Sequence, residues 1–302
     1  MQILAIGECM AELSPAEKTG TFQLGFAGDT FNTAWYLARR CPNADVEFYT
    51  AVGTDPMSMQ MREAFVASGI EGKFVQTIQD KSVGLYLIAL DNGERSFSYW
   101  RGQSAAREMI NDPTNLITAV ESSDVVYFSG ITLAILDIEQ RTRLLNILQT
   151  ARANGKMIAF DPNLRPRLWR YTDEMTKAIM QGAAVSDLVM PSFEDESDWF
   201  NDASPQDTSK RYFDVGAKTV VVKNGSAAVH FRTAESVGEI PAKIVEEVVD
   251  TTAAGDSFNA EIIAGMFNNG TLEESIGRAC QLAAFVVQGR GALVSIEHFK
   301  PD

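Results

Sequence analysis

A stretch of twelve residues near the C-terminus, VDTTAAGDSFNA (residues 249–260), places a run of very small side chains before an aspartate. Apolar residues at helical spacing follow, so we expect a helix that begins near Gly255. A helix start with small side chains lets free N–H groups approach a phosphate, and the helix dipole favours negative charge there. Asp256, in the same turn, can accept the proton of a hydroxyl that attacks the terminal phosphate of ATP. The stretch predicts phosphoryl transfer, and the alternative is an ordinary helix start capped by Asp or Thr.

The composition is that of a globular protein with excess negative charge. The 302 residues are 45% hydrophobic, enough for a sizeable core, and the formal net charge is -14. Nucleic acid and anionic membranes attract basic surfaces, so we expect neither as a partner. The N-terminal segment MQILAIGECM has no basic start, and no apolar run reaches the roughly 18 residues of a membrane span. We therefore expect a cytoplasmic protein whose three separated cysteines are reduced.

Short apolar runs alternate with segments of helical spacing along the whole chain. The expected strands are 3–6, 46–52, 125–128, 157–160, 188–190, 219–222 and 227–231, and the expected helices are 30–40, 56–68, 137–153, 175–184, 255–267 and 272–287. Strands separated by helices of this length imply right-handed crossovers and a sheet covered on both faces. We expect one α/β domain, residues 1–302, with a doubly wound, mostly parallel central sheet.

One region departs from this alternation. Residues 83–100 contain two β-rich runs joined by Asp91-Asn92-Gly93, which is a strong hairpin signal because Asn-Gly accepts the positive φ of a tight turn. We assign residues of about 8–26 and 82–102 to a small antiparallel β lid. The lid would expose strand edges and apolar residues, so we expect lids to pair between subunits and the protein to be at least a dimer.

Ligands of a doubly wound sheet bind beyond the carboxyl ends of its strands. The sequence there contains neither a Walker A motif nor a GxGxxG fingerprint. A nicotinamide dehydrogenase, which would share the sheet, is therefore not supported, and any phosphate must be held in another way.

At this point the sequence resembles the ribokinase-like (PfkB-type) sugar kinases. Residues 250–258 resemble the motif D-T-[TS]-[GA]-A-G-D-x-F of that family, and residues 26–34, FAGDTFNTA, resemble its G-G-x-x-x-N-x-A element. Further motifs agree in order: VGTD at 52–55, GER at 93–95, DPN at 161–163, VKNG at 222–225 and GRGA at 289–292. The resemblance spans essentially the whole chain and implies ATP and Mg²⁺ as cofactors.

The resemblance also implies roles for individual residues. Asp256 would be the catalytic base, and Ala253, Ala254 and Gly255 would form the anion hole beside it. The residues expected beside the nucleotide are Ser192, Lys223, Gly225, Ala254 and Gly255.

Two departures concern metal ions and the sugar side. Where the family often has N-x-x-E, this chain has Ser192-Phe193-Glu194-Asp195. We assign Asp195 to Mg²⁺, which it would hold through water, and Glu194 and Glu196 are the alternatives. The competing interpretation is that these acidic residues form a solvated helix start. Ala27 replaces the first glycine of G-G. In several relatives the segment equivalent to Asp250 helps to hold a monovalent cation, so K⁺ is a further candidate.

Two arginines bear on the choice of sugar. Arg101 follows the lid hairpin and Arg165 follows the strand that ends at Asp161, and arginine binds a carboxylate through two parallel bonds. The stretches GDTFNTA at 28–34, YWR at 99–101 and SAA at 104–106 most resemble the 2-keto-3-deoxygluconate kinases of the family. The residues expected to contact the sugar are Gly28, Asp29, Asn32, Tyr86, Tyr99, Arg101, Arg165 and Asp256.

The expected reaction is transfer of the terminal phosphate of ATP to the C6 hydroxyl of 2-keto-3-deoxygluconate. Fructokinases of the family also show a D-P-N-x-R run, so fructose or another neutral sugar is the alternative substrate, and the arginines can also be surface residues. A non-catalytic module that senses sugar or nucleotide is a third possibility, which the retained Asp256 argues against.

Overall fold

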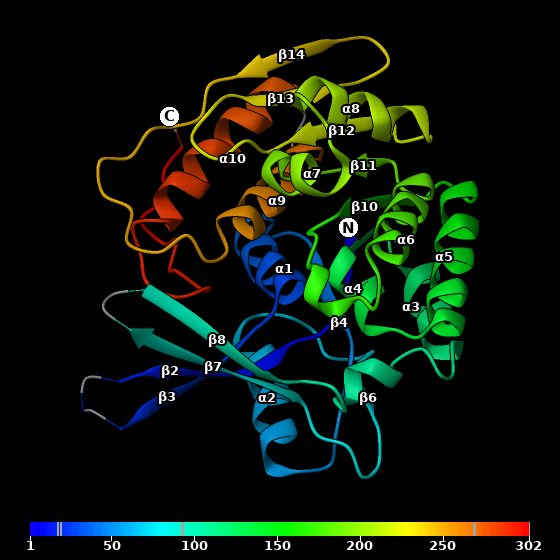
Figure 1. The fold of residues 1–302 in the computed structure, drawn as a ribbon. Coiled ribbons are helices and arrows are strands. Elements are labelled where there is room, and N and C mark those ends of the chain that lie inside the picture. The colour runs from blue at the N-terminus through cyan, green and yellow to red at the C-terminus, as the bar shows by residue number, and fades with distance from the viewer. Residues whose placement is uncertain (17, 19, 92–93, 268–269, 302) are drawn as a thin grey trace.

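The computed structural model describes residues 1–16, 18, 20–91, 94–267 and 270–301, and a large sheet forms its centre (Figure 1). Within these residues its strand order is β14-β13-β12-β11-β10-β9-β1-β4. The strands are β1 (Gln2–Ile6), β4 (Asp45–Tyr49), β9 (Val125–Ser129), β10 (Met157–Asp161), β11 (Leu188–Val189), β12 (Thr219–Val222), β13 (Val229–Arg232) and β14 (Val237–Ile240). Pairing is parallel from β4 to β12, and β13 and β14 add antiparallel strands at one edge. The predicted mostly parallel sheet is confirmed.

Helices cover both faces of this sheet (Figure 1). One face carries α1 (Asp29–Arg40), α2 (Pro56–Ala67), α9 (Ala254–Gly265) and α10 (Leu272–Val286). The other carries α3 (Thr114–Ser122), α4 (Gly130–Ile135), α5 (Ile138–Ala153), α6 (Thr172–Ala184), α7 (Phe193–Phe200) and α8 (Pro205–Asp214), with the short 3₁₀ turns η1 (Ala105–Glu108) and η2 (Pro166–Leu168). Strand β1 shows why both faces are apolar: Ile3 packs into one core and Leu4 into the other.

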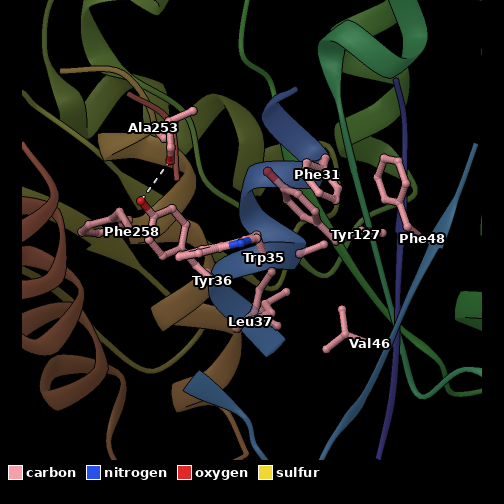
Figure 2. Close-up of a cluster of buried hydrophobic side chains, with 14 of the residues drawn as sticks. Phe31, Trp35, Tyr36, Leu37, Val46, Phe48, Tyr127, Ala253 and Phe258 are labelled. Atoms are coloured by element: carbon pink, nitrogen blue, oxygen red, sulfur yellow. Dashed lines mark hydrogen bonds between the residues drawn. The ribbon is translucent and has the colours of Figure 1, made fainter. Parts of the chain in front are cut away.

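Helix α1 anchors the first of these cores. Its residue Phe31 packs edge-on against Phe48 of β4 with ring centroids 5.6 Å apart, and Trp35 packs edge-on against the neighbouring Tyr36 (Figure 2). Phe258 of α9 belongs to the same core. The packing fixes α1 against α9, and both helices begin at the predicted site.

A second sheet lies beside the main one, with the order β3-β2-β7-β8 (Figure 1). Its strands are β2 (Met10–Pro15), β3 (Phe22–Ala27), β7 (Gly84–Asp91) and β8 (Glu94–Trp100). It consists of two antiparallel hairpins, and β2 pairs with β7 in parallel to join them. The small antiparallel sheet is confirmed, and the parallel join is a feature that the hairpin signal did not predict. The turn residues Asn92 and Gly93 lie outside the described residues.

Element ends differ from the expectation at two strands. The predicted strand 46–52 is interrupted at Thr50, whose carbonyl accepts a hydrogen bond from the Gln76 backbone, and its last residues pair as β5 (Ala51–Val52) with β6 (Gln76–Thr77). The predicted strand 227–231 begins only at Val229. The three cysteines are free and buried. In the described part of the chain, no helix has the length and apolar character needed to span a bilayer.

Candidate active site

The start of α9 has an unusual backbone. Helix residues begin at Ala254, and the capping residue Ala253 has φ +60° and ψ +13°, the left-handed conformation that normally favours glycine. No side chain makes a capping hydrogen bond there. The interpretation of this segment as an ordinary helix start capped by Asp or Thr is therefore wrong. The N–H of Ala254, predicted for the anion hole, donates to the Thr251 carbonyl at 3.2 Å, and no described side chain caps the N–H groups that follow it.

Asp250 holds the loop that leads into this helix. One carboxylate oxygen accepts hydrogen bonds from the backbone and hydroxyl of Thr252, at 3.0 and 2.7 Å, and the other accepts the N–H of Gly291 at 2.7 Å. Asp250 thus joins the helix start to the GRGA segment near the C-terminus. Its carboxylate is engaged in structure, as expected for a residue that is not the base.

The Asp256 carboxylate meets helix α1. Asn32 donates from Nδ2 to Oδ2 of Asp256 at 2.8 Å, and the N–H of Gly28 donates to Oδ1 of Asn32 at 3.3 Å. The hydroxyl of Thr33 donates to the backbone carbonyl of Asp256 at 3.3 Å. Burial, followed by the nearby Asp29 carboxylate, raises the pKa of Asp256 to about 8, against the opposing hydrogen bond from Asn32. A carboxyl group with such a pKa can take up a proton near neutral pH.

Lys223 is held beneath the helix start by two buried groups. Its Nζ lies 2.9 Å from Oδ2 of Asp161 and 3.1 Å from Oδ1 of Asn259, and Asn259 donates to the same Asp161 oxygen at 2.6 Å. A Cβ placed on Gly255 would lie 3.5 Å from the Lys223 ammonium. The glycine in the first turn of α9 thus lies next to a fixed positive charge, an arrangement suited to phosphate.

The residues predicted to bind nucleotide line one cavity of about 580 Å³. They are Ser192, Lys223, Gly225, Ala254 and Gly255. The remaining wall is largely apolar and includes Val229, Ile244, Val248, Phe258, Ala283 and Val287. A polar end at the α9 start and an apolar end away from it suit a nucleotide, with its phosphates at the first and its base at the second.

Asp195 and Arg165, predicted for different ligands, lie together. Their side chains form an ion pair at 3.5 Å, and the Arg165 side chain is 51% exposed. Burial raises the pKa of Asp195, and Arg165 acts in the opposite direction. Within the described residues, no group of three or more His, Cys, Asp or Glu side chains is placed to hold a metal ion directly.

On the small sheet, Tyr86 and Tyr99 face each other across β7 and β8 with ring centroids 5.8 Å apart. The Tyr86 hydroxyl donates to the Glu12 carboxylate, whereas Tyr99 is 52% exposed. Arg101 is buried and forms an ion pair with Glu8. No contact between these predicted sugar residues and Asp256 occurs among the described side chains.

Asp29, the first residue of α1, connects to the hydrogen-bond network around Lys223. It accepts a hydrogen bond from Nδ2 of Asn163 at 2.8 Å, and the Asn163 backbone donates to Asp161 at 3.0 Å. Asp29 is thereby tied to the carboxylate that holds Lys223. The structure brings the base, Lys223 and the predicted sugar residues Gly28, Asp29 and Asn32 together, whereas Tyr86, Tyr99 and Arg101 lie on or next to the small sheet.

Several residues of the described site were not predicted, among them the central Asp161. Asn259 and Tyr127 complete the network around Asp161, with Asn259 donating to the Tyr127 hydroxyl at 3.2 Å. Glu8 and Glu12 engage Arg101 and Tyr86. A buried asparagine three residues after Asp256 in an apolar helix was a usable signal, whereas the glutamates carry no local motif.

The sequence matches the pfkB family carbohydrate kinases over residues 1–298. It is 39% identical to a 2-dehydro-3-deoxygluconokinase of Dickeya dadantii (strain 3937), with 98% of this chain and 97% of the relative covered. It is 38% identical to a 2-dehydro-3-deoxygluconokinase of Escherichia coli (strain K12), with 98% of each chain covered. The structure is similar to that of a PfkB protein from Polaromonas sp. JS666, with a TM-score of 0.85, 26% identity, and coverage of 95% of this chain and 96% of that one.

Proposed function

This chain belongs to the pfkB family of carbohydrate kinases, and we propose that it transfers the terminal phosphate of ATP to the C6 hydroxyl of 2-dehydro-3-deoxygluconate (2-keto-3-deoxygluconate). Full-length relatives at 38 and 39% identity bear the name of this activity. The observation that carries the proposal is the Asp256 carboxylate, held by Asn32 at the uncapped start of α9 beside the nucleotide cavity.

In the proposed reaction, Asp256 accepts the proton of the C6 hydroxyl as its oxygen forms a bond to the terminal phosphorus. The bond from that phosphorus to the bridging oxygen breaks, and ADP leaves. The N–H groups around Ala253 and Gly255 and the Lys223 ammonium would offset the charge on the transferring phosphoryl group, whereas the Ala254 N–H would first have to leave the Thr251 carbonyl. A pKa near 8 lets the Asp256 carboxyl hold the proton until it is released to solvent.

We assign sugar recognition to residues at the start of α1 and to residues on the small sheet, and we call the space between these two sides the cleft. Gly28, Asp29 and Asn32 lie at the start of α1, next to the base. Arg101 and Arg165 would bind the carboxylate of the acid sugar, with Tyr86 and Tyr99 beside them. Arg165 is half exposed and can reorient toward a ligand, whereas Arg101 is already fixed.

Mg²⁺ is expected with the triphosphate, where it would neutralise phosphate charge. The absence of a direct ligand cluster among the described residues fits an ion that keeps its waters, with Asp195 as the acid that holds it through water. For K⁺, both Asp250 oxygens already accept hydrogen bonds, so backbone carbonyls would have to supply the ligands. Turnover measured with EDTA, and in KCl against tetramethylammonium chloride, tests the two ions separately.

We also propose that residues 1–302 form one kinase domain in which the small sheet is a lid and pairs with the lid of a second copy. Phe22, Leu24 and Trp100 leave apolar surface exposed on that sheet. Light scattering on the purified protein tests the dimer, and Trp100→Ser should weaken it. We further propose that the enzyme acts in the cytoplasm, where ATP and small metabolites are present.

The deciding experiment is coupled ATP turnover with magnesium on 2-dehydro-3-deoxygluconate and on fructose, with Asp256→Asn as the blank. A clear preference for the acid sugar is the expected result. Preference for fructose would overturn the substrate and keep the kinase. Lack of turnover on both sugars would overturn the kinase assignment and favour a sensing module.

A further inference from the structure

Glu8 is a buried carboxylate that sits directly after β1, at the carboxyl end of a central strand. It is 2% exposed. One of its oxygens accepts a hydrogen bond from Nη2 of Arg101 and the other accepts the Ser104 hydroxyl. A buried charge is tolerated only when it is paired and hydrogen-bonded, and Glu8 meets both conditions with neighbours from the end of β8. The pair therefore holds the Arg101 guanidinium in one place.

The guanidinium retains unused donors. Nε of Arg101 is buried and has no hydrogen-bond partner within the described part of the chain. An unpaired buried donor is costly, so a guanidinium held in this state is arranged for an acceptor from outside the chain. The planar fork of arginine matches a carboxylate, which would take two parallel N–H bonds.

Two glycines make room for the pair. A Cβ on Gly84 of β7 would lie 2.8 Å from Oε1 of Glu8 and 3.2 Å from Cβ of Arg101, so a larger residue at this position would displace the pair. A Cβ on Gly28 would lie 2.2 Å from the backbone carbonyl of Glu8. Gly28 in turn donates to Asn32, which holds the Asp256 carboxylate. The Glu8 backbone thus sets the spacing between the fixed arginine and the base.

We infer that Glu8 is a positioning residue for substrate recognition, which holds the Arg101 guanidinium so that its free donors meet the carboxylate of an acidic sugar at a set distance from Asp256. The inference rests on the proposed function. Selectivity for acidic sugars would then depend on Glu8, which itself contacts no substrate and carries the same negative charge as the sugar carboxylate.

The test is steady-state kinetics of Glu8→Gln on 2-dehydro-3-deoxygluconate. Glutamine keeps the shape but loses the charge that orients Arg101, so KM for the sugar should rise about tenfold to a hundredfold. The kcat and the KM for ATP should change less than about twofold, because the carboxylate end of the sugar does not react and binds equally in ground and transition states. An unchanged or lowered KM for the sugar would overturn the inference.

A double-mutant cycle separates positioning from a structural role. In an Arg101→Lys background, Glu8→Gln should add little to KM, since its effect passes through the guanidinium. Multiplying effects would show that Glu8 acts independently, against the inference. The matched control is Glu261→Gln, a buried carboxylate that pairs with Arg40 and Arg278. It should lower Tm with no selective change in KM.

Ser104→Ala provides a gentler variant if Glu8→Gln folds poorly. It removes one hydrogen bond to Glu8 and should raise the sugar KM in the same direction by a smaller factor. Turnover by the wild-type enzyme distinguishes failure of the proposed function from failure of the positioning role of Glu8. Without turnover of the acid sugar the proposed function fails, whereas turnover with unchanged KM in both Glu8→Gln and Ser104→Ala defeats the positioning role alone.

Discussion

The two sides of the cleft are built in different ways. At the α9 start, Asp256, Lys223 and Asn259 are joined through hydrogen bonds to α1 and β10; Asn259 is buried, and Asp256 and Lys223 are half-buried. On the small sheet, Arg101 is equally fixed, but Tyr99 is half exposed and Arg165, on the opposite side, is on the surface. The groups for transfer chemistry thus form a hydrogen-bonded framework, whereas the groups for sugar recognition combine fixed residues such as Arg101 and Tyr86 with the more exposed Tyr99 and Arg165.

The difference follows from what each side must do. Groups that stabilise a transition state act best when they are already oriented and shielded from water, because reorganisation then costs little during the reaction. A sugar must enter and leave, so its contacts need access. If this comparison holds, changes at the α9 start should alter stability and turnover together, and changes on the small sheet should separate the two.

The largest expected effect is that of Asp256→Asn, which should lower kcat by roughly 100- to 10,000-fold because the general base is lost. The folded protein should persist. Since the folded pKa of about 8 lies above the ordinary value of 3.8, wild-type stability from this group is full at low pH and is lost as the pH rises through 8. The free energy of unfolding in urea should therefore fall less between pH 5 and pH 9 in the variant than in the wild type. Retention of most activity would remove Asp256 as the base.

Lys223→Met should lower the free energy of unfolding by about 3 kcal/mol, because it leaves the Asp161 carboxylate buried without its cation. The KM for ATP should rise in the same variant. Adding Asp161→Asn should recover part of the stability. Lys210→Met, which breaks an exposed pair with Asp214, is the control and should cost less than about 1 kcal/mol. Equal losses in the two single variants would contradict a buried, site-forming pair.

The pH profile of kcat/KM examines the same region without removing a charge. Activity should rise with pH and level off above an inflection near 8, since the base must be ionised in the free enzyme. Asn32→Ala removes the hydrogen bond that favours the ionised form, so its inflection should move to higher pH. An inflection that stays in place would mean that a different group limits the rate.

Much of this framework was predictable because its signals are local. The small residues before Asp256 and the alternation of strands and helices lie in short windows of sequence, and both were confirmed at the level of the fold. The partners of Asn259 and Glu8 could not be found in this way. Asn259 meets Asp161 and Tyr127 across 98 and 132 residues, and Glu8 meets Arg101 across 93. Such partners become neighbours only through the topology of two sheets.

Backbone conformation and strand pairing were also not predictable from local sequence. The left-handed residue at the start of α9 is an alanine, so the glycine that would normally reveal it is absent. The pairing of β2 with β7 is similar: each hairpin has its own turn signals, but nothing local specifies that the two hairpins join in parallel. Long-range pairing of this kind is fixed by packing rather than by propensity.

On the small sheet, Tyr99→Ala should separate function from stability. Because Tyr99 is 52% exposed, the free energy of unfolding should change by less than about 0.5 kcal/mol. The KM for the sugar should still rise roughly fivefold as a wall of the site is lost, with kcat little changed. A fall in stability as large as that of Lys223→Met would erase the contrast between the two sides of the cleft.

The smallest expected effect concerns two neighbouring alanines in different conformations. Ala253→Gly relieves a left-handed φ that costs about 1 to 2 kcal/mol for residues with a Cβ. This gain offsets two losses, namely the methyl contact of Ala253 and the greater conformational freedom that glycine gives the unfolded chain. Its stability should stay close to that of the wild type. Ala254→Gly lies in the helix proper, where glycine costs about 1 kcal/mol. Thermal unfolding of the two variants side by side should rank Ala253→Gly as the more stable. The reverse order would mean that the anion-binding backbone does not hold Ala253 in strain.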